Sequence, residues 1–154
     1  MVFLRDTILN KLQSNPVAQQ MLQFGNNIGN LFPNEEALCM ASAFMQDKQT
    51  RIVVKKNRYE AQQLYQRLKP LIDDTLLFVM EESLRVQAIA SSPEDKQEQL
   101  YVLTQLVKED KPRIIICNTA AFLRYLPDIE LFKSLCFKFE VDQEITMTEL
   151  KQKL

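Results

Sequence analysis

Four consecutive apolar residues, Ile114-Ile115-Ile116-Cys117, restrict the fold of this chain more than any other segment. A strand with one face in solvent alternates between apolar and polar residues, whereas a strand covered on both faces is continuously apolar. Continuous apolar strands are typical of parallel sheets, because their crossover connections place helices on both faces. This segment therefore predicts a buried strand in an α/β domain.

Strand-like and helix-like segments alternate before this strand. Ile52-Val53-Val54 and residues 75–79 have the composition of strands. Asn57, with Glu60 three residues later, is a variant of the capping box and predicts a helix that ends before Pro70. The order strand, helix, strand is that of a parallel βαβ unit.

The N-terminal quarter of the chain predicts mainly helices. An apolar stripe over residues 3–12 predicts a helix that ends at Asn15-Pro16. Residues 20–24 are ambiguous, and a short strand is one interpretation of them. Asn34 is expected to cap a further helix, with acidic residues in its first turn.

The segments after residue 80 predict more helices. One helix is expected at residues 84–90, and Ser92-Pro93 is expected to begin another. The second helix is predicted to bury three residues of its apolar face, namely Leu100, Leu103 and Val107.

The last forty residues predict two short helices and a strand. Asn118-Thr119 is expected to open a helix that continues through Leu126. Strict alternation over residues 135–141 predicts a half-exposed strand. Thr146 and Glu149 form a second capping box, and the helix it begins is expected to continue in a longer protein.

These segments together predict an α/β fold with a mainly parallel sheet flanked by helices. One compact domain is expected over residues 1–130. Residues 131–154 are expected to form the truncated start of a second domain.

Composition excludes several classes of function. Nineteen Lys and Arg residues against twenty Asp and Glu residues give a formal net charge of −1, without the basic excess of a dedicated nucleic-acid clamp. The sequence contains no His, which excludes His-based catalytic triads, His metal ligands and a His general base.

The cysteines and the apolar segments indicate the compartment. Cys39, Cys117 and Cys136 are odd in number and have no CxxC spacing, so we expect reduced, buried thiols. No apolar run reaches the ~18 residues that a membrane span needs, and the N-terminus has no signal-peptide pattern. A cytoplasmic protein without a membrane partner is expected.

The turn before the helix at Asn34 is where a nucleotide-binding protein would place its phosphate loop, after its first strand. Such a loop needs glycines, a lysine and a hydroxyl group. Here Pro33 removes an amide donor, Phe32 is bulky, and Glu35 and Glu36 bring negative charge. No nearby cation is expected to compensate these carboxylates, so we expect no ATP to bind at this turn.

A basic cluster surrounds the strand at residues 52–54. Lys55, Lys56 and Arg58 follow its carboxyl end and are candidates for a weak nucleic-acid contact. The alternative is a solvated loop in which these cations form local ion pairs.

Four segments occur in an order that is known from one protein family. They are Ile52-Val53-Val54 with Tyr59-Glu60-Ala61-Gln62-Gln63-Leu64-Tyr65, then Ala88-Ile89-Ala90-Ser91-Ser92-Pro93-Glu94, then Ile114-Ile115-Ile116 with Leu123-Arg124-Tyr125-Leu126-Pro127, and finally Val141-Asp142-Gln143-Glu144-Ile145 through Leu154. In this order they resemble the N-terminal region of bacterial transcription-repair coupling factors (Mfd), which is related to the excinuclease subunit UvrB.

The resemblance implies a degenerate nucleotide-binding fold of the RecA or UvrB domain 1a type over residues 1–130, followed by the start of the UvrA-docking domain 2. The phosphate-loop remnant of the family, Gly-Leu-Ser-Gly-Ser, lines up with Asn30-Leu31-Phe32-Pro33-Asn34, and Glu36 stands where a lysine would be. The resemblance thus implies a chain without catalytic residues, cofactor or metal.

The parent protein that the resemblance implies is an ATP-driven DNA translocase that displaces stalled RNA polymerase and recruits UvrA. ATP and magnesium would bind to its motor domains, and its partners would be UvrA, RNA polymerase and double-stranded DNA. Two alternatives remain open. One is an ATP-binding fragment of a UvrB-like helicase or excinuclease subunit that uses Lys55 or Lys56, and the other is a DNA-binding module built on the basic cluster.

Overall fold

The computed structural model describes residues 2–23, 25–81, 93–136 and 146–147. They belong to two compact units, Met1–Leu123 and Arg124–Leu154. The helix expected at residues 84–90 and most of the strand expected at residues 135–141 lie outside the described residues.

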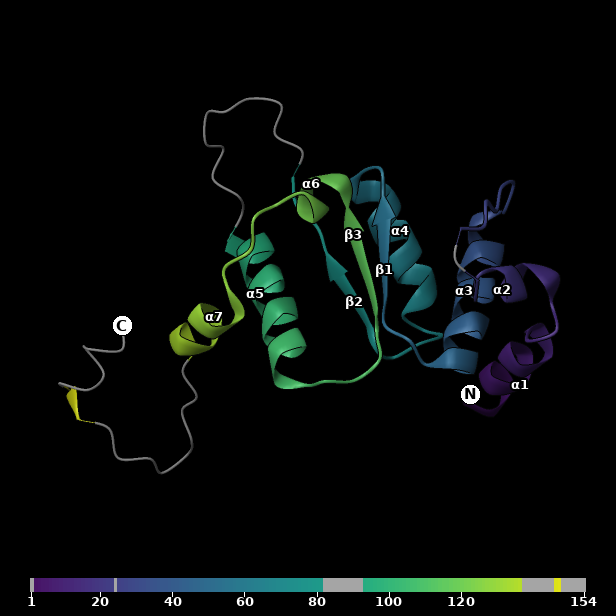
Figure 1. Cartoon of the computed structure of the whole chain (residues 1–154), viewed down its shortest axis with the longest axis horizontal. Coiled ribbons are helices and arrows are strands. Elements are labelled where there is room, and N and C mark those ends of the chain that lie inside the picture. Colours follow the sequence, from purple (N-terminus) through teal and green to yellow (C-terminus); the bar gives the residue numbers. More distant parts are fainter. Residues whose placement is uncertain (1, 24, 82–92, 137–145, 148–154) are drawn as a thin grey trace. The chain divides into compact units, whose positions relative to one another are not determined.

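The first unit contains a sheet of three parallel strands, β1 (Arg51–Lys55), β2 (Thr75–Phe78) and β3 (Ile114–Asn118), in the order β1-β3-β2 (Figure 1). The central strand β3 is the one that its continuous apolar sequence predicts to be buried. Ile114 and Ile116 are both 0% exposed. The α/β class and the parallel sheet are therefore confirmed.

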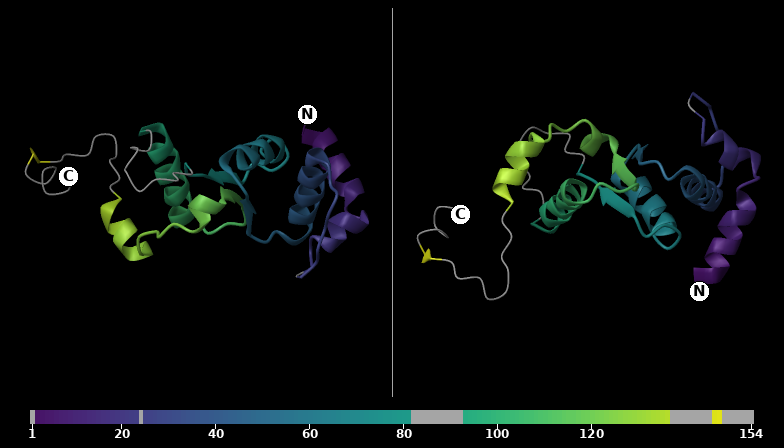
Figure 2. Two further views of the ribbon diagram at one scale, coloured as in Figure 1. Left: turned by 90° about the horizontal axis from the view of Figure 1, so that it is seen from above. Right: turned by 60° about the horizontal axis from the view of Figure 1, so that its bottom comes forward.

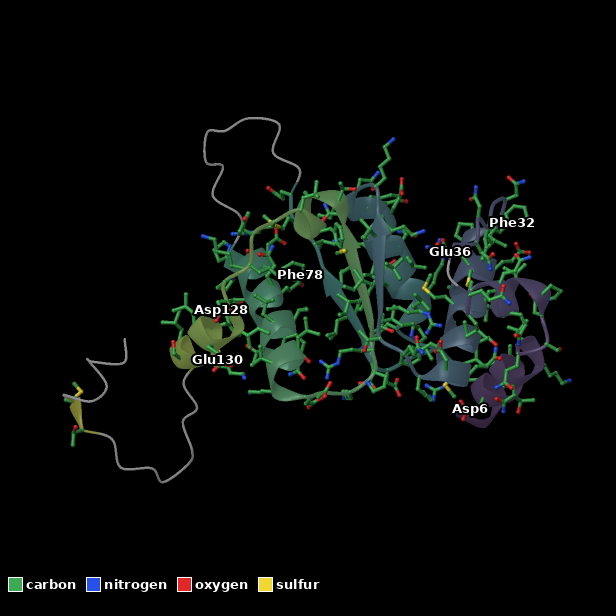
Figure 3. The ribbon with its side chains drawn as sticks, viewed as in Figure 1. Asp6, Phe32, Glu36, Phe78, Asp128 and Glu130 are labelled. Atoms are coloured by element: carbon green, nitrogen blue, oxygen red, sulfur yellow. The ribbon has the colours of Figure 1, made fainter. Side chains whose placement is uncertain are left out.

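One face of the sheet packs against α3 (Pro33–Asp47) and α4 (Arg58–Leu68). The other face packs against α5 (Pro93–Lys108) and α6 (Thr119–Phe122). Because side chains alternate along β3, Ile114 and Ile116 belong to the first core, and Cys117 belongs to the second. Figure 2 shows α4 and α5 on opposite sides of the sheet, and Figure 3 shows Phe78 on the side of α5.

Two short N-terminal helices, α1 (Val2–Leu12) and α2 (Pro16–Gln20), pack on α3. Asn15 does not only end the first helix but also caps the second, because its Oδ1 accepts a hydrogen bond of 2.9 Å from the Val17 N–H. The strand interpretation of residues 20–24 is wrong, since turn hydrogen bonds from Met21 and Leu22 follow α2 directly. Ser42 ties α3 to α1 by donating to the Leu9 carbonyl at 3.1 Å.

The start of α3 differs from the prediction. Its N-cap is Phe32, whose N–H donates to the Glu35 carboxylate at 3.0 Å, and Pro33 occupies the first helical position. Proline suits this position because its ring fixes φ and no N–H is needed there. Asn34 is already inside the helix, where its Oδ1 accepts a hydrogen bond from Arg67 Nε.

The helix α4 begins as the capping box predicts. Asn57 Oδ1 accepts a hydrogen bond of 2.8 Å from the Glu60 N–H, and the helix ends at Leu68, before Pro70.

The helix α5 starts at Pro93 as predicted, but its buried face is rotated from the expected one. Leu100 is 54% exposed, and Val102 is buried in its place. Asp95, in the first turn, is buried because it pairs with Arg58 at the start of α4. This ion pair lies on the side of α5 that is buried, in agreement with the rotation of its buried face. The sequence pattern does not reveal the pair.

The segment after β3 also departs from the prediction. The helix α6 stops at Phe122 rather than Leu126. In the second unit, Asp128 does not stop a helix but caps α7 (Ile129–Leu135), accepting from the Glu130 N–H at 2.9 Å. Leu135 is therefore helical and not part of a strand.

The central position of β3 gives a direct test of the packing. Replacing Ile116 with alanine leaves a cavity in the core and should reduce the free energy of unfolding by about 2–5 kcal/mol. The matched control is Ile52→Ala on the neighbouring strand, where the side chain is 59% exposed and the cost should stay below about 1 kcal/mol. Urea unfolding measures both values, and equal costs would contradict the assignment of β3 as the buried strand.

Candidate functional site

The turn expected to correspond to a phosphate loop does not have the required strand–loop–helix arrangement. Within residues 2–23 and 25–32, the structure contains helices and irregular segments but no strand, and β1 comes after α3. The expectation of a first strand before this turn is therefore wrong. Asn30, in this turn, has a φ of 59°. Phe32, at the start of α3, is 72% exposed, and Glu36 lies one turn further along the helix (Figure 3).

Glu36 is compensated by a cation, contrary to the sequence expectation. Lys55 Nζ, at the end of β1, lies 2.5 Å from Glu36 Oε1. Both side chains are largely shielded, with exposed fractions of 21% for Lys55 and 27% for Glu36. The contact could not be seen in the sequence because the two residues are 19 positions apart. The lysine ammonium and the carboxylate therefore compensate each other.

A cavity of about 300 Å³ adjoins this ion pair, between the start of α3 and α4. Its lining contains two cations, two carboxylates, a tyrosine, a glutamine and two apolar residues: Lys55, Arg67, Glu36, Glu60, Tyr59, Gln63, Pro33 and Leu64. The formal charges of the lining cancel. Arg67 is held in place by Asn34 at 3.0 Å and by the Gln63 carbonyl at 2.6 Å.

Arg58 is also engaged within the chain. Its guanidinium makes two hydrogen bonds to Asp95, of 2.8 and 2.6 Å, and lies 3.8 Å from Glu81. The hydrogen bonds to Asp95 raise the pKa of Arg58. A paired, fork-like contact of this kind is geometrically specific, so the two helices that carry it are fixed relative to each other.

Arg51, at the start of β1, is paired in the same manner. It makes two hydrogen bonds to Asp47, of 2.8 and 2.6 Å, and these lower the pKa of the Asp47 carboxyl. Lys56 is exposed and has no ion-pair partner in the part of the chain that the structure describes. The basic cluster thus consists mostly of local ion pairs, and Lys56 alone of the three candidates for a nucleic-acid contact presents an uncompensated charge.

The carboxyl ends of the three strands are tied together by polar side chains. Asn118, at the end of β3, donates to the Met80 carbonyl at 2.9 Å and accepts from the Met80 N–H at 3.1 Å. Its Oδ1 also caps α6 by accepting from the Ala121 N–H. Thr119 Oγ1 lies 3.3 Å from the carbonyl oxygens of both Lys55 and Lys56.

These contacts matter because ligands of open α/β sheets bind beyond the carboxyl ends of the strands. Here Asn118 and Thr119 fill that position with the chain's own hydrogen bonds. In the sequence, the Asn118-Thr119 pattern predicts only the start of a helix. The place of Asn118 at the end of the buried strand was the sequence signal for its second role, which is to bind the main chain of Met80.

The cysteine thiols and the acidic side chains are the remaining candidates for a chemical site. Cys39 and Cys117 are buried as expected, and burial raises the pKa of both thiols. Cys136 is exposed, so the expectation of a buried thiol is wrong there. Among the described residues, no three His, Cys, Asp or Glu side chains are grouped to hold a metal ion. Within the same residues, no helix combines the length and apolar character of a membrane span.

Comparison with known proteins identifies a related region. Over 104 residues, or 66% of this chain, the sequence is 29% identical to the transcription-repair-coupling factor of Bacillus subtilis (strain 168). The aligned region is only 9% of the length of that relative. No family model and no solved structure matches the chain. The chain therefore contains a region related to transcription-repair coupling factors, as its sequence pattern predicts.

The closure of the strand ends can be tested through Asn118. The substitution Asn118→Ala removes the hydrogen bonds to Met80 and Ala121 from a side chain that is 0% exposed, and should lower the free energy of unfolding by about 2–3 kcal/mol. Asn57→Ala, which removes an exposed helix cap, is the control and should cost about 1 kcal/mol. If Asn118→Ala cost no more than the control in urea unfolding, Asn118 would not hold the strand ends together.

Proposed function

We propose that this chain is a non-catalytic module of a protein that couples the removal of stalled RNA polymerase to nucleotide excision repair. The sequence similarity to the Bacillus subtilis factor supports this role. In the proposal, residues 1–130 correspond to a UvrB-like domain 1a that has lost its nucleotide site, and residues 131–154 begin the domain that recruits UvrA. ATP, magnesium, DNA and RNA polymerase engage other parts of the parent protein, which acts in the cytoplasm.

The observation that carries the non-catalytic role is the ion pair between Glu36 and Lys55. A phosphate loop presents a lysine and free amides to the phosphates. Here the lysine is neutralised by a carboxylate, Pro33 offers no amide, and the Phe32 amide is bonded to Glu35. A triphosphate at this corner would meet two carboxylates and would have to break the ion pair.

A second candidate function is ATP binding, as in a UvrB-like helicase subunit. The cavity of about 300 Å³ beside Lys55 and Arg67 favours it, because both cations line a concave surface next to the start of a helix. The opposing carboxylates Glu36 and Glu60 line the same cavity, and for this reason we place this function second.

Calorimetric titration with ATP and magnesium separates the two functions. We expect no saturable heat at millimolar nucleotide, because Lys55 is already paired with Glu36 and the Phe32 amide is already bonded to Glu35. The variant Glu36→Gln serves as the matched control. It removes one of the carboxylates that oppose the phosphates and leaves Lys55 without its ion-pair partner. Saturable binding to the unmodified chain, abolished by Lys55→Ala, would establish the second function and refute the first.

A chimeric protein tests the coupling role itself. In this experiment the region of the Bacillus subtilis factor that aligns with this chain is replaced by the chain's own sequence, and repair of the transcribed strand is measured. We expect coupled repair to be retained, and the same chimera carrying Lys55→Ala should repair equally well. Loss of coupled repair in a chimera that is folded and still displaces RNA polymerase would contradict the proposed role.

A further inference from the structure

The outer edge of β1 has main-chain groups that no described strand uses. The Arg51 N–H donates to the Arg113 carbonyl at 3.0 Å. In a parallel ladder this register directs the main-chain groups of Arg51, Val53 and Lys55 toward β3. The N–H and C=O groups of Ile52 and Val54 consequently point away from the sheet.

The side chains of the same two residues are exposed, at 59% for Ile52 and 43% for Val54. They lie on the face of the sheet that α5 and α6 cover, because they are in register with Ile115 and Cys117. In the described part of the chain, the strand residues of the packed core on that face come from β2 and β3. Within the described ranges, the outward main-chain groups and the apolar side chains of Ile52 and Val54 are therefore without a partner at this edge.

The opposite edge of the sheet, formed by β2, is protected. The Ile114 N–H donates to the Asp74 carbonyl, so Asp73 and Thr75 direct their carbonyls outward. Lys69 Nζ donates to both of these carbonyls, at 2.6 and 3.2 Å. A lysine at a sheet edge is a known device against the addition of another strand.

The cations of β1 do not protect its edge in this manner. Arg51 and Lys55 alternate with the exposed residues and lie on the other face of the sheet, where they pair with Asp47 and Glu36 of α3. Lys56, directly after β1, is exposed and forms no ion pair within the residues that the structure describes. The edge therefore combines apolar side chains with an available cation at its carboxyl end.

We propose that the outer edge of β1 binds an extended strand of a partner protein, in which acidic residues flank alternating apolar residues. Main-chain hydrogen bonds to Ile52 and Val54 would provide the register, and their side chains would pack beside the apolar residues of the incoming strand. The acidic residues would pair with Lys56. This inference depends on the geometry of the sheet and not on the proposed role in repair.

Charge argues against a second copy of this chain as the occupant. In an antiparallel pair centred on Val53, Arg51 of one copy would lie opposite Lys55 of the second copy. Like charges directly opposite each other destabilise a strand pair. An acidic strand meets no such repulsion.

The experiment uses the whole chain, labelled with ¹⁵N, and a synthetic peptide. In this peptide valine and isoleucine alternate with threonine, and a glutamate stands at each end. We expect saturable binding and slower hydrogen exchange at the amides of Ile52 and Val54. The amides of Thr75 and Leu77, at the protected edge, provide the internal control and should not change. A peptide with lysine at both ends should bind more weakly.

Two variants test the main-chain and charge contributions separately. Val54→Pro removes the outward N–H and keeps the hydrogen bonds of Val53 and Lys55 to β3, so affinity for the acidic peptide should fall about tenfold. Ile52→Glu leaves the main chain unchanged and should also weaken binding, because its carboxylate faces an acidic strand. The spectrum of each variant shows whether the sheet is intact.

Several outcomes would overturn the proposal. These are the absence of saturable binding up to the solubility of the peptide, protection at Thr75 and Leu77 instead of Ile52 and Val54, or unchanged affinity in a folded Val54→Pro variant. Self-association of the chain in sedimentation equilibrium, with protection of the same two amides, would show that a second copy occupies the edge and would equally refute a partner strand.

Discussion

The burial of β3 on both faces is the constraint on which the rest of the structure depends. Its apolar residues need a helical layer on each side, and its main chain needs a parallel strand at each edge. The helices α3 and α4 form one layer, and α5 and α6 form the other. Where the strand ends, its polar residue Asn118 is 0% exposed and must find hydrogen-bond partners inside the protein.

Those partners determine what this domain is able to do. Asn118 makes hydrogen bonds to both main-chain groups of Met80, and Thr119 Oγ1 donates a hydrogen bond to the Lys55 carbonyl at the end of β1. In many α/β proteins the same place is left open for a ligand. At the neighbouring corner, near the start of α3, Glu36 forms an ion pair with Lys55. Polar groups at the position where other sheets bind a ligand here make hydrogen bonds and an ion pair within the chain itself.

The sequence was sufficient where the information is local. The apolar run at residues 114–117 and the capping box of Asn57 predicted the buried strand and α4, since neither depends on distant residues. The start of α3 was missed because Pro33 and Glu35 allow a cap without a polar side chain at Phe32. The rotation of α5 was missed because it involves Asp95 pairing with Arg58, 37 positions earlier.

The candidate site shows the same limit. The sequence predicted a corner between Gly29 and Glu36 that is unfavourable for phosphates, and a basic cluster with local ion pairs as the alternative to a nucleic-acid contact. That the cluster supplies the cation for the corner follows only from the fold, which places the end of β1 beside the start of α3. The difference between the two sheet edges is likewise invisible in the sequence, because it depends on which strand lies outermost.

The most direct measurement of the central claim is a crystal structure of this chain with magnesium and a non-hydrolysable ATP analogue at millimolar concentration. We expect no nucleotide at the start of α3, with Lys55 still paired to Glu36 and Asn118 still bound to Met80. Phosphate groups held by the amides before α3, with Lys55 turned from Glu36 to the phosphates, would contradict it.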